Sequence, residues 1–224
     1  MRGLLGFRAQ SMGGARRSVP ILVQQALTSA SSSLVTKEDC IADIFAFGAD
    51  GSGASRASGS SGGAGGAAGY SRLALAAKSL IAWNVGAGGL STGNPGNDIA
   101  GQAGGDTTIS INGVLLGTAG GGPGGLVAAP APRSAATGFQ INRYGGGSAE
   151  AGEFGGASGA DRGGGGGGFS DMFEGAIGGA GGEASPPSVP ISASFAGGGG
   201  AGVSQRYSGY GGSGLVVINL YRLA

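Results

Sequence analysis

Glycine-rich patches recur along most of this chain, and they limit what it can fold into. The patches follow one another about every twenty residues without a strict period. Each glycine costs about 0.5–1 kcal/mol more to order than alanine does. A run such as the six consecutive glycines at 163–168 is therefore either a disordered tether or a segment whose packing requires the absence of side chains. The ten patches are 47–53, 62–69, 85–89, 101–105, 117–125, 145–147, 163–168, 175–182, 196–202 and 209–214.

The overall composition favours an ordered chain. Glycine accounts for 56 of 224 residues, yet hydrophobic residues reach 40%, charged residues only 11%, and the net charge is +1. Disordered chains usually combine low hydropathy with high charge, which is the opposite balance. No sustained Gly-X-Y register occurs, so collagen is also excluded. The patches are therefore expected to be packed.

Several segments between the patches have the pattern of β-strands. Residues 40–47, CIADIFAF, are apolar on both alternating faces except for Asp43, as in a strand buried on both sides. Residues 72–85 indicate two short strands joined near Lys78 and Ser79. In residues 107–116, β-branched residues flank Asn112-Gly113, a strong hairpin signal. Residues 215–221, LVVINLY, predict a final apolar strand.

Glycine runs can adopt the polyproline-II backbone, which has three residues per turn, a rise of about 3.1 Å and outward-facing peptide groups. Helices of this kind packed side by side can hydrogen-bond to their neighbours, and close packing leaves room only for glycine. We therefore expect a mostly irregular, all-β fold of about ten packed polyglycine-II helices, with short strands and hairpins at one end. The glycines predicted to be structural are Gly86, Gly88, Gly89, Gly104, Gly105, Gly165 and Gly166.

The N-terminal segment differs in composition from the rest. Residues 1–36 contain Arg2, Arg8, Arg16 and Arg17 but no acidic residue. We interpret residues 1–39 as an extended attachment arm and residues 40–224 as the glycine-rich domain; a targeting peptide is the alternative. The single cysteine, Cys40, cannot form an intrachain disulfide, so packing or partner chains must provide stability.

Several function classes are disfavoured by the residues present. Histidine is absent, which excludes Ser-His-Asp and Cys-His nucleophiles and histidine-containing metal sites. No Lys/Arg stripe suits nucleic acid, and the apolar run 19–23 is too short to span a bilayer. The carboxylate pairs Glu150/Glu153 and Asp171/Glu174 are typical of solvated surface. We expect no enzymatic activity, cofactor or metal.

Three features in this order resemble a known family. They are Val85-Gly-Ala-Gly-Gly89, Gly104-Gly-Asp-Thr107, and the change from glycine to an aliphatic strand at 214–221. Residues 40–224 resemble the glycine-rich domain of bacteriophage tail proteins, including the tips of long tail fibres. The resemblance implies a sandwich of packed polyglycine-II helices whose distal loops recognise the host surface.

Alternating directions of the glycine segments predict which connections lie at which end. The strands at 40–47 and 214–221, and the segments 70–84 and 107–116, should share the end near the arm. The loops 52–61, 90–100, 126–144, 169–174 and 203–208 should lie at the opposite end. Arginine beside aromatic residues suits sugar or protein contacts, although an aromatic residue beside a glycine run can also simply cover the edge of the packed glycines. The candidates for receptor binding are Asn94, Pro95, Arg133, Phe139, Arg143, Tyr144, Phe169, Met172, Phe173, Arg206 and Tyr207.

The sequence therefore predicts a virion tail component, a tail-fibre or baseplate tip protein that binds a host surface protein or glycan. The alternative is a purely structural subunit of the tail, baseplate or capsid surface with no receptor role. In either case other tail or fibre subunits would be bound through residues 1–39.

Overall fold

The computed structural model describes residues 21–56, 62–90, 99–126, 131–145, 203–204 and 208–222, and these residues form an all-β protein. The strands are β1 (Ile21–Thr28), β2 (Ser32–Val35), β3 (Cys40–Phe47), β4 (Ser55–Arg56), β5 (Ala68–Leu75), β6 (Leu80–Asn84), β7 (Thr107–Ile111), β8 (Val114–Ala119), β9 (Ala136–Thr137), β10 (Ile141–Arg143), β11 (Val203–Ser204) and β12 (Leu215–Arg222).

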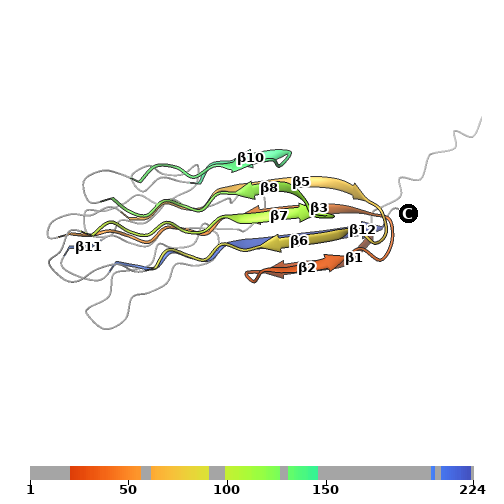
Figure 1. Ribbon diagram of the computed structural model, residues 1–224, viewed down its shortest axis with the longest axis horizontal. Coiled ribbons are helices and arrows are strands. Elements are labelled where there is room, and N and C mark those ends of the chain that lie inside the picture. Colours follow the sequence, from red (N-terminus) through yellow and green to blue (C-terminus); the bar gives the residue numbers. More distant parts are fainter. Residues whose placement is uncertain are drawn as a thin grey trace, which may run out of the picture.

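Two antiparallel five-stranded sheets form a sandwich at one end of the molecule (Figure 1). The first sheet has the order β1-β12-β3-β5-β10 and the second has the order β2-β6-β7-β8-β9. A short parallel pair, β4 and β11, lies far from both sheets, at the opposite end of the described segments. We call the sandwich end the strand end and the opposite end the far end.

The core lies between the two sheets and follows strand alternation. Ile44 of β3 and Ile218 of β12 point inward from the first sheet, and Ile81 and Ile109 do so from the second; all four are fully buried. Trp83 packs in the same cluster and donates its indole N–H to the Ala30 carbonyl at 2.9 Å. The hydrogen bond connects the β1–β2 link to the second sheet.

The strands expected from the sequence are present, with one difference in connectivity. The Asn112-Gly113 hairpin is confirmed: φ is 51° at Asn112 and 81° at Gly113, as a type I′ turn requires. Residues 72–85 do contribute two strands, with Lys78 at φ 67° in the turn. However, these two strands do not pair with each other as a hairpin, because β5 pairs with β3 in the first sheet and β6 joins the second. The turn instead carries the chain across the sandwich.

Beyond the strands, glycine-rich segments lie side by side and hydrogen-bond to one another. In residues 48–53, successive N–H groups donate to three different neighbours in rotation, and every third residue returns to the same neighbour. The pairs are Gly48 with Ala67, Ala49 with Gly105, Asp50 with Gly212, Gly51 with Ala64, Ser52 with Gln102, and Gly53 with Gly209, at 2.8–3.3 Å from N to O. This three-residue period differs from a β-ladder, in which a strand pairs with at most two neighbours.

Backbones approach too closely in this region for most side chains. A Cβ added at Gly51, Gly66 or Gly104 would lie under 3.0 Å from backbone atoms of an adjacent segment. At Gly105 the nearest atom would be 3.1 Å away. The glycine content therefore follows from packing geometry at these positions.

The described glycine segments alternate in direction, as expected, but the loop predicted at 126–144 is wrong. Residues 131–137 already run back to the sandwich: Gly120 donates to the Ala135 carbonyl at 3.0 Å, and β9 pairs with β8. The turn at 138–140 then leads into β10, which pairs with β5. Alanine and serine replace glycine in this returning segment, with Ala131, Ser134 and Ala136 buried, so its sequence contained no glycine signal.

Part of the predicted arm is integrated into the sandwich. Residues 21–35 supply β1 to the edge of the first sheet and β2 to the edge of the second. The described part of the chain contains no helix of the length and apolarity needed to cross a membrane.

Candidate functional site

Contacts between the outer ends of several glycine segments define the far end of the described structure. Gly53 donates to the Gly209 carbonyl at 3.3 Å, and Gly101 donates to the Gly125 carbonyl at 2.7 Å. A Cβ on Gly89 would lie 2.5 Å from the Ser52 nitrogen, which places the third glycine segment at this level too. Five described segments of the chain therefore begin or end at this level.

Many of the sequence-predicted residues fall outside the described residues. These are Asn94, Pro95, Phe169, Met172, Phe173, Arg206 and Tyr207 among the receptor-binding candidates, together with Gly165 and Gly166 among the structural glycines. Their predicted roles remain predictions.

The other four receptor-binding candidates do not lie together in one far-end loop. Phe139 is only 5% exposed and packs in the sandwich core, where it also covers Gly69 and Gly117, so we do not retain it as a surface contact. The Asn142 side chain bonds both the N–H and the C=O of Phe139 and fixes this turn. Sequence reasoning treated the aromatic ring as an exposed loop residue because the turn was not recognised.

Arg133, Arg143 and Tyr144 are exposed along the side of the glycine segments. Arg143 lies opposite Ala68 in the β10–β5 pair. Gly145 donates to the Ser134 carbonyl at 3.1 Å, so the chain segments that carry Tyr144 and Arg133 are directly joined. This side surface is the only place where the structure brings described candidates near one another.

The described structural glycines differ in how tightly they are enclosed. A Cβ at Gly86, Gly88, Gly89 or Gly104 would lie under 3.0 Å from the backbone of another segment, whereas Gly105 has slightly more space. In addition, Thr107 accepts the Gly86 N–H at 3.1 Å and fully buried Asp50 accepts the Gly66 N–H at 2.8 Å. Polar side chains thus serve as acceptors where no neighbouring carbonyl does.

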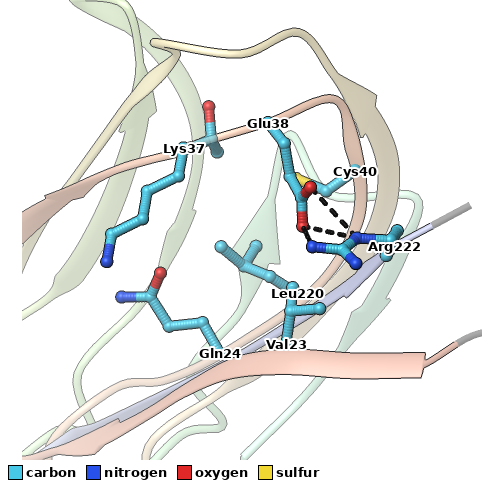
Figure 2. A pocket seen from close by; sticks show the side chains of 8 residues that line it. Val23, Gln24, Lys37, Glu38, Cys40, Leu220 and Arg222 are labelled. Carbon is cyan, nitrogen blue, oxygen red and sulfur yellow. Dashed lines mark hydrogen bonds and ion pairs between the residues drawn. The ribbon is translucent and has the colours of Figure 1, made fainter.

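A pocket of about 430 Å³ opens at the strand end, beside the edge strand β1 (Figure 2). Val23 is the extra residue of a β-bulge in β1, where Leu22 pairs with Tyr221 and Gln24 with Leu220. The bulge and the β2–β3 connection at residues 36–38 form the pocket walls, and Leu220 and Cys40 lie at its inner side. Sequence analysis did not identify this pocket.

Charged groups surround the pocket opening. The Glu38 carboxylate binds Arg222, with 2.8 Å from Oε1 to Nη2, and this bond raises the pKa of the Arg222 guanidinium above its ordinary value. Lys37 is exposed and makes no ion pair within the described residues. One carboxylate and two cations therefore line the pocket, and the carboxylate is paired with Arg222.

Cys40 is a buried free thiol on the inner wall. Burial raises the pKa of the thiol, and the nearby charges of Glu38 and Asp39 raise it further. The thiol is thus held in its neutral, unreactive form.

Exposed aliphatic side chains gather at the strand end. Strand pairing places the start of β1, the end of β2, the start of β6 and the β7–β8 turn at this end. The exposed residues there are Ile21, Leu22, Val23, Val35, Leu80, Val114 and Leu115. Exposed apolar groups that gather in one region are typical of interaction surfaces.

The fold defines a class of protein: a small β-sandwich extended by packed glycine-rich segments. The chain belongs to the glycine-rich domain family, whose model matches residues 28–221. No curated protein sequence matches the chain significantly. The family match begins inside the segment that the sequence analysis assigned to the arm.

Proposed function

We propose that the glycine segments are polyglycine-II helices packed into a lattice. The hydrogen bonds of residues 48–53 support this, because their three-residue period equals the three residues per turn of the polyproline-II backbone. The close approach of backbones around Gly51, Gly66 and Gly104 supports it as well. Such a lattice is a rigid spacer that holds its two ends at a fixed separation.

We propose further that the protein is a component of a phage virion tail, a tail-fibre or baseplate tip that binds the host cell surface. The observation that carries this proposal is the separation of two different ends. The sandwich carries exposed aliphatic residues at one end, and connections between glycine segments begin and end at the other. The motif order that resembles phage tail proteins and the glycine-rich family support the assignment.

In this proposal the strand end and the preceding residues join other tail subunits, and the far-end connections contact a host surface protein or glycan. The exposed Arg133 and Tyr144 on the side surface are further candidates for that contact. A nucleic-acid partner, a cofactor and a catalytic role form no part of the proposal, and the protein is expected to act on the virion at the bacterial outer surface.

A structural role without receptor binding is the second candidate. The exposed aliphatic residues of the strand end favour it, because they suit burial against neighbouring subunits. In that case the far end would face another subunit of the tail, baseplate or capsid surface.

The two candidates differ in the behaviour of the isolated protein. Fluorescently labelled protein is incubated with a panel of bacterial strains and with outer-membrane vesicles prepared from them, and bound fluorescence is measured. Receptor binding predicts saturable binding to particular strains. Replacing residues 91–98 by a glycine-serine linker of equal length should reduce it.

A matched control replaces Val114 and Leu115 at the strand end by serine, and it should bind as the unmodified protein does. Binding to no strain, or binding that the linker variant retains and the strand-end variant loses, would instead support the structural role.

A further inference from the structure

We propose that the outer edge of β1 and the adjoining pocket bind an extended segment of a different protein by strand addition, with an aliphatic side chain in the pocket and an acidic side chain beside Lys37. The inference goes beyond the proposed function, and it holds whether or not the protein is a virion component.

β1 differs from the other edge strands of the sandwich. It has eight residues, whereas β2, β9 and β10 have four, two and three. Among the described residues no strand pairs with its outer side. Proteins usually protect long edges with charges, proline or coverage, and the β1 sequence ILVQQALT has neither a charge nor a proline. This strand is therefore an open template for backbone hydrogen bonding.

The pocket lies where an added strand would place its inward side chains. Gln24, Leu220 and Cys40 are inner-face residues of the first sheet, and all three line the pocket. The volume of about 430 Å³ exceeds what one aliphatic side chain occupies, and Val23 and Leu220 supply apolar contact. A strand beside β1 would close this opening with one of its alternating side chains.

Charge selects the kind of segment that fits. The Glu38 carboxylate is already bound to Arg222 at 2.8 Å, so among the described residues of this pocket Lys37 is the cation that makes no ion pair. Figure 2 shows the Lys37 side chain reaching toward Gln24 of β1. An acidic residue two positions from the aliphatic one would lie on the same face of the added strand and near Lys37.

The position of Lys37 also argues against a second copy of this chain that pairs through its own β1. Residues 1–36 contain no acidic residue, so a β1-to-β1 pair would bring no carboxylate to Lys37. We therefore assign the edge to a different protein that carries an acidic, aliphatic strand.

The test uses the full chain and a fluorescein-labelled heptapeptide, Thr-Leu-Thr-Glu-Thr-Val-Thr, with blocked ends. Two comparison peptides replace its glutamate by glutamine or the threonine directly before the glutamate by proline, and binding is followed by fluorescence anisotropy. The glutamate peptide should bind about two- to fivefold more tightly than the glutamine peptide, as expected for an exposed ion pair. The proline peptide should bind poorly, because it lacks a backbone donor.

Two variants locate the charge. The chain has two lysines, Lys37 and Lys78, so Lys37→Gln and Lys78→Gln are a matched pair. Lys37→Gln should remove the preference for glutamate, and Lys78→Gln should retain it.

Equal binding of the three peptides, equal behaviour of the two variants, or no binding in the millimolar range would overturn the proposal. Dimerisation of the protein in sedimentation velocity that Leu27→Lys abolishes would overturn it in favour of a second copy.

Discussion

Adjacent glycines in one segment allow a direct test of why glycine is required. Gly104→Ala places a Cβ 2.6 Å from the Ala49 carbonyl carbon and from the Asp50 oxygen. Ordinary contact begins at 3.4 Å and the Ala49 carbonyl oxygen lies nearer still, so the backbones must separate by more than about 0.8 Å. The hydrogen bonds from Ala49 to Gly105 at 3.1 Å and from Ser52 to Gln102 at 2.9 Å join these segments. Both would lengthen beyond useful range.

Two hydrogen bonds lost at about 1–3 kcal/mol each, less about 0.4–1 kcal/mol gained from the stiffer unfolded chain, give a destabilisation of about 1–6 kcal/mol. In a chain of this size that corresponds to a fall in melting temperature of about 2–24 °C. Gly105→Ala has the same effect on the unfolded chain, but its Cβ meets the nearest atom at 3.1 Å. It should change stability by less than about 1 kcal/mol.

Chemical denaturation and thermal unfolding followed by circular dichroism measure both variants. Equal stability of Gly104→Ala and Gly105→Ala, or a Gly104→Ala protein as stable as the unmodified one, would refute the packing argument.

Three further predictions concern particular side chains. Asp50→Ala removes the acceptor of the buried Gly66 N–H and should lower the free energy of unfolding by about 1–3 kcal/mol. Asp106→Ala removes the acceptor of the Gly121 N–H at an exposed site, so it should lower the free energy of unfolding less. Asn112→Ala should lower the free energy of unfolding by about 1–2 kcal/mol, because φ is 51° at this position and the acceptor for the Leu80 N–H is lost. Asn112→Gly should lower it less, and thermal unfolding of the two variants measures the difference. Because burial raises the pKa of Cys40 above its ordinary value of 9.0, the folded state holds this proton more tightly than the unfolded state. The contribution of this thiol to the free energy of unfolding is therefore complete below pH 9 and is lost as the pH rises above it. Urea titrations from pH 8 to pH 11 should show a shallower fall in the free energy of unfolding for Cys40→Ala than for the unmodified protein.

Local patterns in the sequence predicted the strands best. The alternation of residues 40–47 and the Asn112-Gly113 turn depend on neighbouring residues alone, and both appear where expected as β3 and the β7–β8 hairpin. The residues around Lys78 indicate a turn, but they do not indicate that the turn leads from the first sheet to the second. The partner of a strand depends on residues that are distant in the sequence.

The returning segment 131–137 was missed for a different reason. Glycine marks a segment that other segments enclose closely, but the returning segment beside β8 uses alanine and serine, as Ala131 and Ser134 do. Missing it placed Phe139 on a far-end loop, although the ring is in the core.

The strand-end pocket could not have been predicted either. It arises from the bulge at Val23 and from the path of residues 36–38 over β12, and neither leaves a signal in the sequence. The open edge of β1 depends in the same way on strand order.

The central claim is that the glycine segments form a lattice with a three-residue period. Scalar couplings across hydrogen bonds, measured by NMR on the labelled protein, identify the acceptor of each N–H in residues 48–53. The account predicts Ala67, Gly105 and Gly212 as the acceptors for Gly48, Ala49 and Asp50, with the next three residues returning to the same segments in the same order. Couplings to a single neighbouring segment at alternate residues, as in a β-ladder, would contradict it.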